Sequence, residues 1–191
     1  MSDILSPLDP TQGHQEILKP PSGGFFIPAP LEYSYMTREE RFYQIAKELG
    51  YSFDGEIKVG GNYSPLVQHQ DTIYISGQIP RVGNEVVIQG ALGADVTLDV
   101  GQKAAKICVM RAIALLLKHL GSLDRVQKIL RISVYVQSSS NFTQQSEVSD
   151  GASEVLYSIF GDAGIHSRTS VGVFQLPKNA PVEIDFVVAV D

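Results

Sequence analysis

The chain has 191 residues, 43% of them apolar and 19% charged, which is the composition of a globular protein with a sizeable core. Its formal net charge is −6 and its Lys and Arg residues are dispersed, which argues against a nucleic-acid-binding protein. The lone cysteine, Cys108, excludes an internal disulfide and a CxxC metal site. Because no apolar run approaches the roughly 20 residues of a transmembrane helix and no secretory signal is recognisable, we expect a cytoplasmic protein without membrane contact.

The N-terminal 36 residues hold six of the ten prolines together with several aromatic residues. This composition predicts an irregular arm, which is too apolar for a purely disordered tail and which we expect to pack along the protein or onto a neighbouring molecule. The arm and the helix that follows it are interpreted as an extension, residues 1–52, of a domain formed by residues 53–191.

A capping box precedes the first predicted helix. The Thr37 hydroxyl can accept the amide of Glu40, whose carboxylate can reach back to the Thr37 amide. The apolar stripe that follows ends before Gly50, a residue suited to a left-handed helix C-cap. We therefore expect a helix over residues 38–49 that docks on the domain.

Alternating apolar residues predict three strands, over residues 53–59, 71–79 and 85–89. In the second of these, Ile73 and Ile75 point to one face, and the next proline ends the strand.

Two long helices are predicted over residues 98–120 and 143–160, with a strand over residues 128–137 between them. The first is apolar on most sides and must be largely buried against a sheet. Thr97 is placed to cap it. Cys108 lies inside it and is interpreted as a buried structural thiol, since no basic cluster is placed by sequence to activate it.

Residues 165–186 predict two strands joined by a polar turn that begins at Pro177 and ends at Pro181. We expect a hairpin, with apolar residues on one face and with Arg168 and Glu183 on the other. That second face is neither fully apolar nor typical of a solvated surface, which indicates closure by a ligand or by another subunit. The simpler alternative is an exposed ion pair between Arg168 and Glu183.

The predicted order after the arm and first helix is β-β-β-α-β-α-β-β, an α+β chain. Both large helices are expected on one face of a mixed sheet, because each strand has a single aliphatic face. A homo-oligomer that buries the other face would follow. The side chains expected on that face are Tyr74, Ser76, Arg131, Ser133, Tyr135, Arg168, Ser170, Gly172, Glu183 and Asp185.

The sequence contains no phosphate-binding glycine loop, no GxSxG nucleophile motif and no HExxH zinc motif, and its four histidines are scattered. Nucleotide-binding, serine-hydrolase and zinc-enzyme interpretations therefore lose their best support.

Three sequence blocks stand out: ISGQIP at residues 75–80, RTSV at 168–171, and LPK at 176–178 followed by VEID at 182–185. Together they resemble the Rid family of reactive intermediate deaminases, also called the YjgF or endoribonuclease L-PSP family, over about residues 55–191. The resemblance implies a chorismate-mutase-like α+β fold and a homotrimer whose sheets form a central barrel with clefts between subunits. It also implies hydrolysis of enamine or imine intermediates, such as 2-aminoacrylate, to 2-oxo acids and ammonia without a metal or organic cofactor.

The matching motifs imply roles for five residues. Arg168 corresponds to the arginine that binds the substrate carboxylate, and Glu183 to the glutamate near the attacking water. Tyr63 corresponds to a tyrosine that reaches the cleft, and Ser76 and Gly77 to a segment that lines it. A guanidinium can hold a carboxylate through two hydrogen bonds, and a carboxylate can orient water or act as a general base.

The chain departs from short Rid proteins in its N-terminal extension, which could cover the cleft and change the substrate. His166, two residues before Arg168, is either a further donor in the cleft or a surface residue.

Three functions compete. The first is an imine or enamine deaminase acting on a small carboxylate-bearing metabolite. The second is a non-catalytic module that binds a 2-oxo or amino acid in the same cleft. The third, a ribonuclease, is disfavoured because the chain is acidic and lacks a histidine pair or a basic groove.

Overall fold

The computed structural model describes residues 35–57 and 60–191. Its main sheet has five strands in the order β1-β2-β7-β5-β6, and neighbours are antiparallel except for the parallel pair β5 and β6. A short ribbon, β3 with β4, lies apart from it. The strands are β1 Leu66–His69, β2 Thr72–Gln78, β3 Arg81–Val82, β4 Glu85–Val86, β5 Val126–Gln137, β6 Ser167–Val173 and β7 Val182–Val190.

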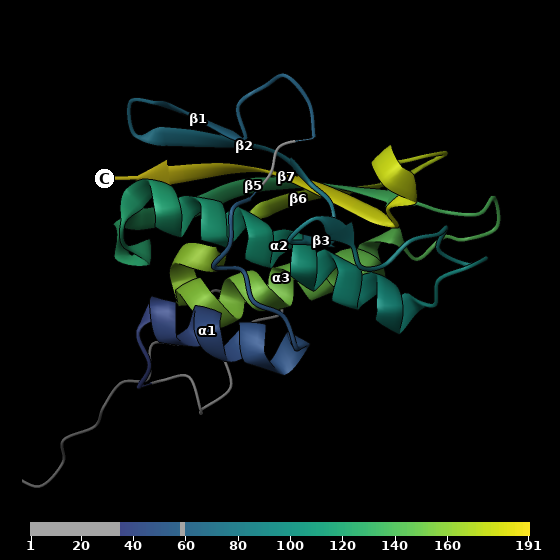
Figure 1. Ribbon diagram of the computed structural model, residues 1–191, viewed down its shortest axis with the longest axis horizontal. Helices are drawn as coiled ribbons and strands as arrows, with labels where there is room; N and C mark the ends of the chain where they lie inside the picture. Colours follow the sequence, from purple (N-terminus) through teal and green to yellow (C-terminus); the bar gives the residue numbers. More distant parts are fainter. Residues whose placement is uncertain (1–34, 58–59) are drawn as a thin grey trace, which may run out of the picture.

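The molecule is built in layers (Figure 1). Helices α2 (Leu98–Leu120) and α3 (Gln145–Phe160) cover one face of the sheet, and α1 (Arg38–Leu49) packs against these two helices on the side away from it. The core lies between the sheet and the helices, where the aliphatic face of every central strand is buried. The predicted α+β class, with both large helices on one face of a mixed sheet, is confirmed.

Helix α1 begins at the predicted capping box. The amide of Glu40 donates to Thr37 Oγ1 at 3.2 Å, and the amide of Thr37 donates to Glu40 Oε2 at 2.8 Å. Gly50 ends the helix with a φ of 78°. Phe42 and Ile45 are buried against the helix layer. Helix α1 therefore lies behind α2 and α3 and does not cover the sheet; the predicted arm, residues 1–34, lies outside the described residues.

Helix α2 has the predicted bounds, but its cap differs. The Thr97 hydroxyl donates to the carboxylate of Asp99 and forms no hydrogen bond with a helix amide. Cys108 is fully buried in this helix, and its burial raises the pKa of the thiol well above the usual range. The prediction of a structural thiol agrees with this environment.

Helices α2 and α3 approach closely at Gly151. A Cβ atom at this position would lie 2.5 Å from the backbone oxygen of Gln102 and 3.0 Å from its Cα. Beside this contact, Gln102 Nε2 donates to the carbonyl of Glu147 at 2.8 Å, and Lys106 pairs with Glu154 at 2.9 Å. The two helices are thus held at a distance that only glycine permits.

Two of the predicted strands were wrong. Residues 53–57 form no strand, and the rest of that prediction lies outside the described residues. Phe53 is buried and packs on Phe42, with ring centroids 6.3 Å apart, so its apolar character reflects a docked loop. The first strand is instead β1. The strand predicted over residues 85–89 is reduced to β4, which pairs with β3 outside the main sheet.

The predicted C-terminal hairpin was also wrong, because β5 lies between β6 and β7. Strand β6 pairs in parallel with β5, with Arg168 opposite Ile132, whose side chain faces the helices. Arg168, Ser170 and Gly172 therefore lie on the helix-covered side and Val171 on the uncovered side, the reverse of the prediction. A two-residue period identifies two faces of a strand but does not say which one is inside.

No helix among the described residues packs on the other face of the sheet (Figure 1). Tyr74 is 52% exposed there and Val171 41%. Tyr135 donates to Asp185 Oδ2 across the strands at 3.2 Å. The predicted members of this face that the strand register places there are Tyr74, Arg131, Ser133, Tyr135, Glu183 and Asp185.

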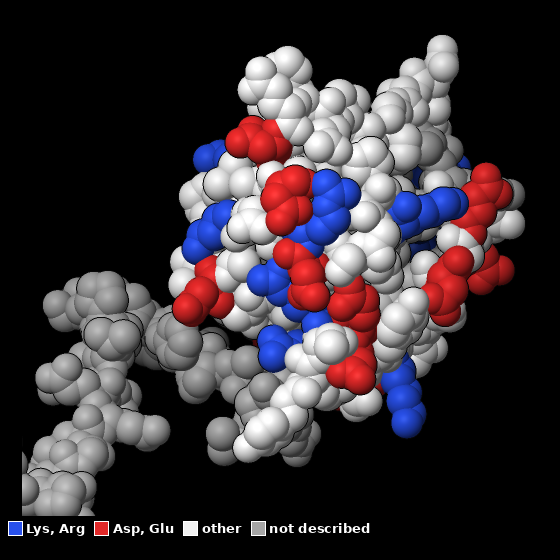
Figure 2. Space-filling view, turned by 90° about the vertical axis from the view of Figure 1, so that its left-hand side faces the viewer, with Lys and Arg blue, Asp and Glu red and all other residues white. Residues whose placement is uncertain are grey.

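Figure 2 shows one side of the molecule, on which basic and acidic side chains intermingle without forming a continuous basic patch. Within residues 35–57 and 60–191, every helix is too short or too polar to cross a membrane.

Candidate functional site

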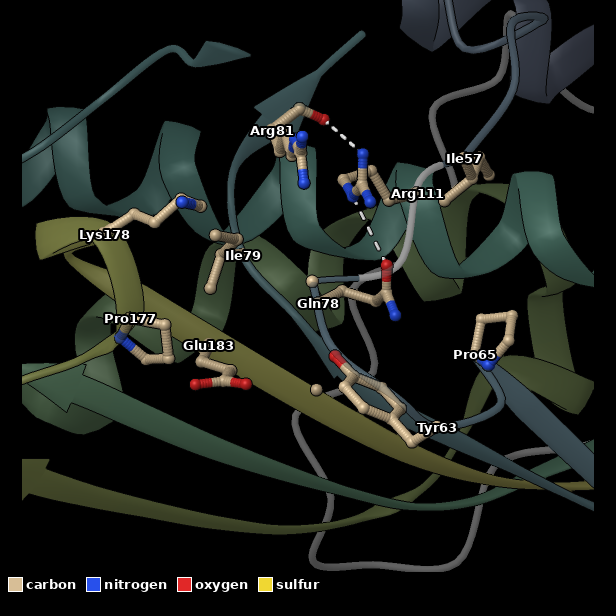
Figure 3. A pocket seen from close by; sticks show the side chains of 12 residues that line it. Ile57, Tyr63, Pro65, Gln78, Ile79, Arg81, Arg111, Pro177, Lys178 and Glu183 are labelled. Atoms are coloured by element: carbon tan, nitrogen blue, oxygen red, sulfur yellow. Dashed lines mark hydrogen bonds between the residues drawn. The ribbon is translucent and has the colours of Figure 1, made fainter. Parts of the chain in front are cut away.

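A pocket of about 210 Å³ opens where the end of β2 passes between β7 and the loop before β1. Its size suits a small metabolite. Several segments distant in sequence contribute side chains to it, as Figure 3 shows. The lining residues are Ile57, Gly60, Tyr63, Pro65, Gly77, Gln78, Ile79, Arg81, Arg111, Pro177, Lys178 and Glu183.

A bulge in β2 places Gly77 against Glu183. The register between β2 and β7 shifts between Ile75 and Gln78, which turns the end of β2. A Cβ atom on Gly77 would lie 2.8 Å from Glu183 Cδ and even closer to Glu183 Oε1. The carboxylate of Glu183 therefore occupies the space that a side chain at position 77 would fill.

Glu183 is half-buried in this pocket, and burial raises the pKa of its carboxyl, as does the nearby charge of Asp185. The ion pairs found among the described residues do not include it. Glu183 thus binds a proton more readily than an ordinary glutamate. A carboxyl group with these properties is suited to accepting and returning a proton.

Tyr63 and Ser76 belong to one structural unit. Tyr63 is 52% exposed and lies across the pocket from Glu183 (Figure 3). Ser76 does not line the pocket; its hydroxyl donates to the carbonyl of Ser64 at 2.9 Å and its amide to that of Pro65 at 3.0 Å. Ser76 therefore fastens the loop that carries Tyr63 to β2.

Arg168 lies outside this pocket, on the edge strand β6. Its Nη1 pairs with Asp150 Oδ1 at 2.9 Å and donates to Ser153 Oγ at 2.9 Å, and its Nη2 donates to Ser146 Oγ at 3.0 Å. All three partners belong to α3. The alternative of an ion pair between Arg168 and Glu183 was wrong, because β5 separates their strands and the two side chains leave opposite faces of the sheet.

His166 belongs to the cluster around Arg168. Its ring stacks on Tyr157 with centroids 5.5 Å apart, its Nε2 lies 3.1 Å from Ser153 Oγ, and its Nδ1 lies 2.6 Å from the carbonyl oxygen of Gly164. Burial lowers the pKa of His166, and the charge of Arg168 adds to this effect. His166 therefore supports the surroundings of Arg168 and does not contact the Glu183 pocket.

A loop held by a buried glutamine forms one wall of the pocket. Gln137 donates to Asn179 Oδ1 at 2.6 Å and accepts the amide of Leu176 at 2.8 Å. Lys178 and Asn179 both have a φ of 58°, a left-handed conformation that is uncommon for residues other than glycine. Such backbone geometry is frequent near functional sites, where the surrounding structure enforces it.

Sequence reasoning did not identify the three cationic residues of the pocket, Arg81, Arg111 and Lys178. Arg111 offered a signal, as a lone charged residue within an otherwise apolar stretch of a buried helix. Of the five residues that the resemblance selected, the pocket brings together Tyr63, Gly77 and Glu183. Within the described part of the chain, no three His, Cys, Asp or Glu side chains gather as metal ligands.

Comparison with known proteins agrees with this architecture. Protein TCP17 of Trypanosoma cruzi is 38% identical over 143 residues, which cover 74% of this chain and 89% of that protein. A 2-iminobutanoate/2-iminopropanoate deaminase of Dermatophagoides farinae is 29% identical over 132 residues, which cover 69% and 88%. The crystal structure of Atu1372 from Agrobacterium tumefaciens, a protein of unknown function, matches with a TM-score of 0.72 and 32% identity over 81% of this chain and 95% of that one.

A family model described as "YjgF/chorismate_mutase-like, putative endoribonuclease" matches residues 49–188. The match spans the sheet, both covering helices and every residue of the pocket. The resemblance noted in the sequence motifs is confirmed, and the chain belongs to the YjgF, or Rid, family with its chorismate-mutase-like α+β fold.

Proposed function

We propose that the protein is a hydrolytic deaminase of reactive enamine and imine intermediates of the 2-aminoacrylate and 2-iminopropanoate type. The observation that carries this proposal is Glu183, a half-buried carboxyl group with a raised pKa and no ion pair among the described residues, placed beside Tyr63 and Gly77. Membership of the family, and the relative that is named a 2-iminobutanoate/2-iminopropanoate deaminase, support it.

The proposed reaction consumes one water and releases one ammonia. Water attacks the carbon of the C=N bond, and its proton passes to the Glu183 carboxylate. The protonated carboxyl returns this proton to the nitrogen, which gives the carbinolamine. The carboxylate then takes the hydroxyl proton of the carbinolamine and passes it to the amino nitrogen, so that the C=O bond forms as the C–N bond breaks and ammonia leaves with a 2-oxo acid. A group that serves as base and then as acid works best when its pKa is close to the working pH, and the raised pKa of Glu183 moves it in that direction.

We further propose that a homotrimer completes the site and that Arg168 of a neighbouring subunit binds the substrate carboxylate. A single chain does not bring Arg168 to Glu183. The helix-free face of the sheet, with exposed Tyr74 and Val171, is suited to assembly. The partner of Arg168 in the single chain, Asp150, is largely exposed, and such ion pairs are weak enough for a substrate carboxylate to replace them.

The test is turnover of 2-iminopropanoate, generated in situ from alanine by an amino-acid oxidase and followed by semicarbazide trapping. The original protein should accelerate loss of the trappable imine. Arg168→Ala should lower kcat/KM by about 100-fold, because truncating one partner of a charged hydrogen-bonded pair costs about 2–5 kcal/mol. Arg125→Ala, which removes the ion pair with Asp191 elsewhere on the surface, should leave the rate unchanged.

Light scattering of both variants checks that each remains assembled. A correctly folded trimer that binds 2-oxo acids but does not accelerate imine loss would contradict the deaminase proposal and favour the binding module.

Gly77→Ala should reduce kcat/KM at least tenfold while the protein stays folded. The new methyl group displaces the side chain of Glu183, and a misplacement of about 1 Å can cost on the order of 100-fold in rate. Gly55→Ala is the matched control, because an added Cβ there meets nothing within 4 Å. Unchanged kinetics in Gly77→Ala would show that the position of Glu183 does not govern the rate.

A further inference from the structure

Arg111 is a buried arginine that forms no ion pair with a carboxylate of the described residues. It projects from α2 and is 5% exposed. Its Nε donates to Gln78 Oε1 at 3.3 Å and its Nη1 to the carbonyl of Arg81 at 2.8 Å, both neutral acceptors. Its Nη2 has no acceptor within residues 35–57 and 60–191. Because arginine is rarely this buried unless it is paired, and no described residue supplies the counter-charge, the arrangement is suited to binding an anion.

Two further cations line the same pocket. Arg81 lies next to Arg111, and its buried Nε has no hydrogen-bond partner in the described part of the chain. Lys178 lies on another wall (Figure 3). None of the three takes part in an ion pair found among the described residues. Those pairs are Arg38 with Asp124, Lys106 with Glu154, Arg125 with Asp191 and Arg168 with Asp150.

Glu183, the one carboxylate among the described lining residues, does not act as the missing counter-ion. Figure 3 shows Arg111 and Arg81 together on one side of the pocket and Glu183 on the other. The pKa of Glu183 is raised, whereas a neighbouring guanidinium that paired with it would lower that pKa. Among the described lining residues there are therefore three positive charges and one negative charge, with two guanidinium groups side by side.

Gln78 fixes the direction of the Arg111 guanidinium. It is 5% exposed, and its Nε2 donates to the carbonyl of Ser76 at 2.8 Å while its Oε1 accepts from Arg111. A guanidinium held in this way offers its remaining N–H groups in a fixed plane, which matches the two oxygens of a carboxylate.

We propose that Arg111 and Arg81 form a second anion site, separate from Arg168, and that the protein prefers dicarboxylic 2-imino acids of four or five carbons. The carboxylate next to the imine is bound by Arg168, the imine carbon lies near Glu183, and the far carboxylate reaches Arg111 and Arg81. This inference rests on the proposed deaminase function and specifies the substrate class for it.

The test compares the binding of two 2-oxo acids of equal length by isothermal titration calorimetry. The probes are 2-oxoglutarate, which ends in a second carboxylate, and 2-oxopentanoate, which ends in a methyl group. The original protein should bind 2-oxoglutarate at least tenfold more tightly, and Arg111→Gln should remove this preference while leaving 2-oxopentanoate affinity within about threefold. Arg125→Gln should retain the preference, since Arg125 lies outside the pocket.

Equal binding of the two acids by the original protein would overturn the proposal without any variant. A preference that persists in both Arg111→Gln and Arg81→Gln would overturn the assignment of the site to these residues. The outcome is independent of turnover. If the original protein does not hydrolyse imines but prefers 2-oxoglutarate, only the deaminase function is refuted. If it hydrolyses 2-iminopropanoate but does not prefer 2-oxoglutarate, only the second anion site is refuted.

Discussion

Glu183→Gln should lower turnover of 2-iminopropanoate by about 100-fold or more, the usual contribution of a positioned general acid–base group. The activity of the original protein should fall at low pH as Glu183 becomes protonated. This fall in rate is the acidic limb of the pH–rate profile. Because burial and the charge of Asp185 raise the pKa of the Glu183 carboxyl, the limb should lie at a higher pH than the usual range of a glutamate. The limb should be absent from whatever activity remains in the variant.

A measurement of stability distinguishes loss of the acid–base group in Glu183→Gln from misfolding of this variant. The folded state binds the Glu183 proton more tightly than the unfolded state, so the stability associated with this group is greatest below its unfolded pKa and declines as the pH rises through the folded pKa. Glu183→Gln removes that decline and should be at least as stable as the original protein at pH 7, as measured by urea unfolding.

Asp185→Asn is the matched control for Glu183→Gln. Asp185 lies two residues along the same strand face, and its charge raises the pKa of Glu183. The variant should keep its maximal rate and shift the acidic limb to lower pH. A pH–rate profile that is identical in Glu183→Gln and the original protein would exclude Glu183 as the acid–base group.

Gly151→Ala should reduce the free energy of unfolding by about 1–3 kcal/mol, the range for overpacked interiors. The added methyl group would meet the backbone of Gln102, which cannot turn away as a side chain can, so α2 and α3 must move apart. The measurement is urea denaturation followed by circular dichroism. Gly55→Ala again serves as control, since an added methyl group there has open space. Equal stability of both variants would show that the helices separate at no cost.

Local signals predicted the helices well. The capping box at Thr37, the C-cap at Gly50 and the long apolar run around Cys108 are encoded within a few residues of where they act, and the structure places α1 and α2 at the expected bounds. The one local failure, Thr97, arises because Asp99 competes for its hydroxyl.

Strand pairing depends on long-range contacts, and there prediction from the sequence failed. The turn after Pro177 is compatible with a hairpin, yet β5 enters between β6 and β7 and reverses the face on which Arg168 lies. For the site, the motifs singled out five residues, of which Tyr63, Gly77 and Glu183 line the pocket and Ser76 and Arg168 do not. They could not reveal Arg111, because a single arginine in a buried helix belongs to no motif, and its meaning appears only once Gln78 and Arg81 are seen beside it.

The position of β7 has a consequence for biosynthesis. This strand, Val182–Val190, lies in the middle of the sheet, where Ala189 pairs with both Thr72 and Lys128. A nascent chain that has not yet emerged from the ribosome through residue 190 therefore carries β2 and β5 with unpaired edges and an incomplete apolar layer. Unpaired edges and exposed apolar surface make incomplete folds prone to aggregation, and a chain cut short before residue 182 lacks the strand that joins the two halves of the sheet.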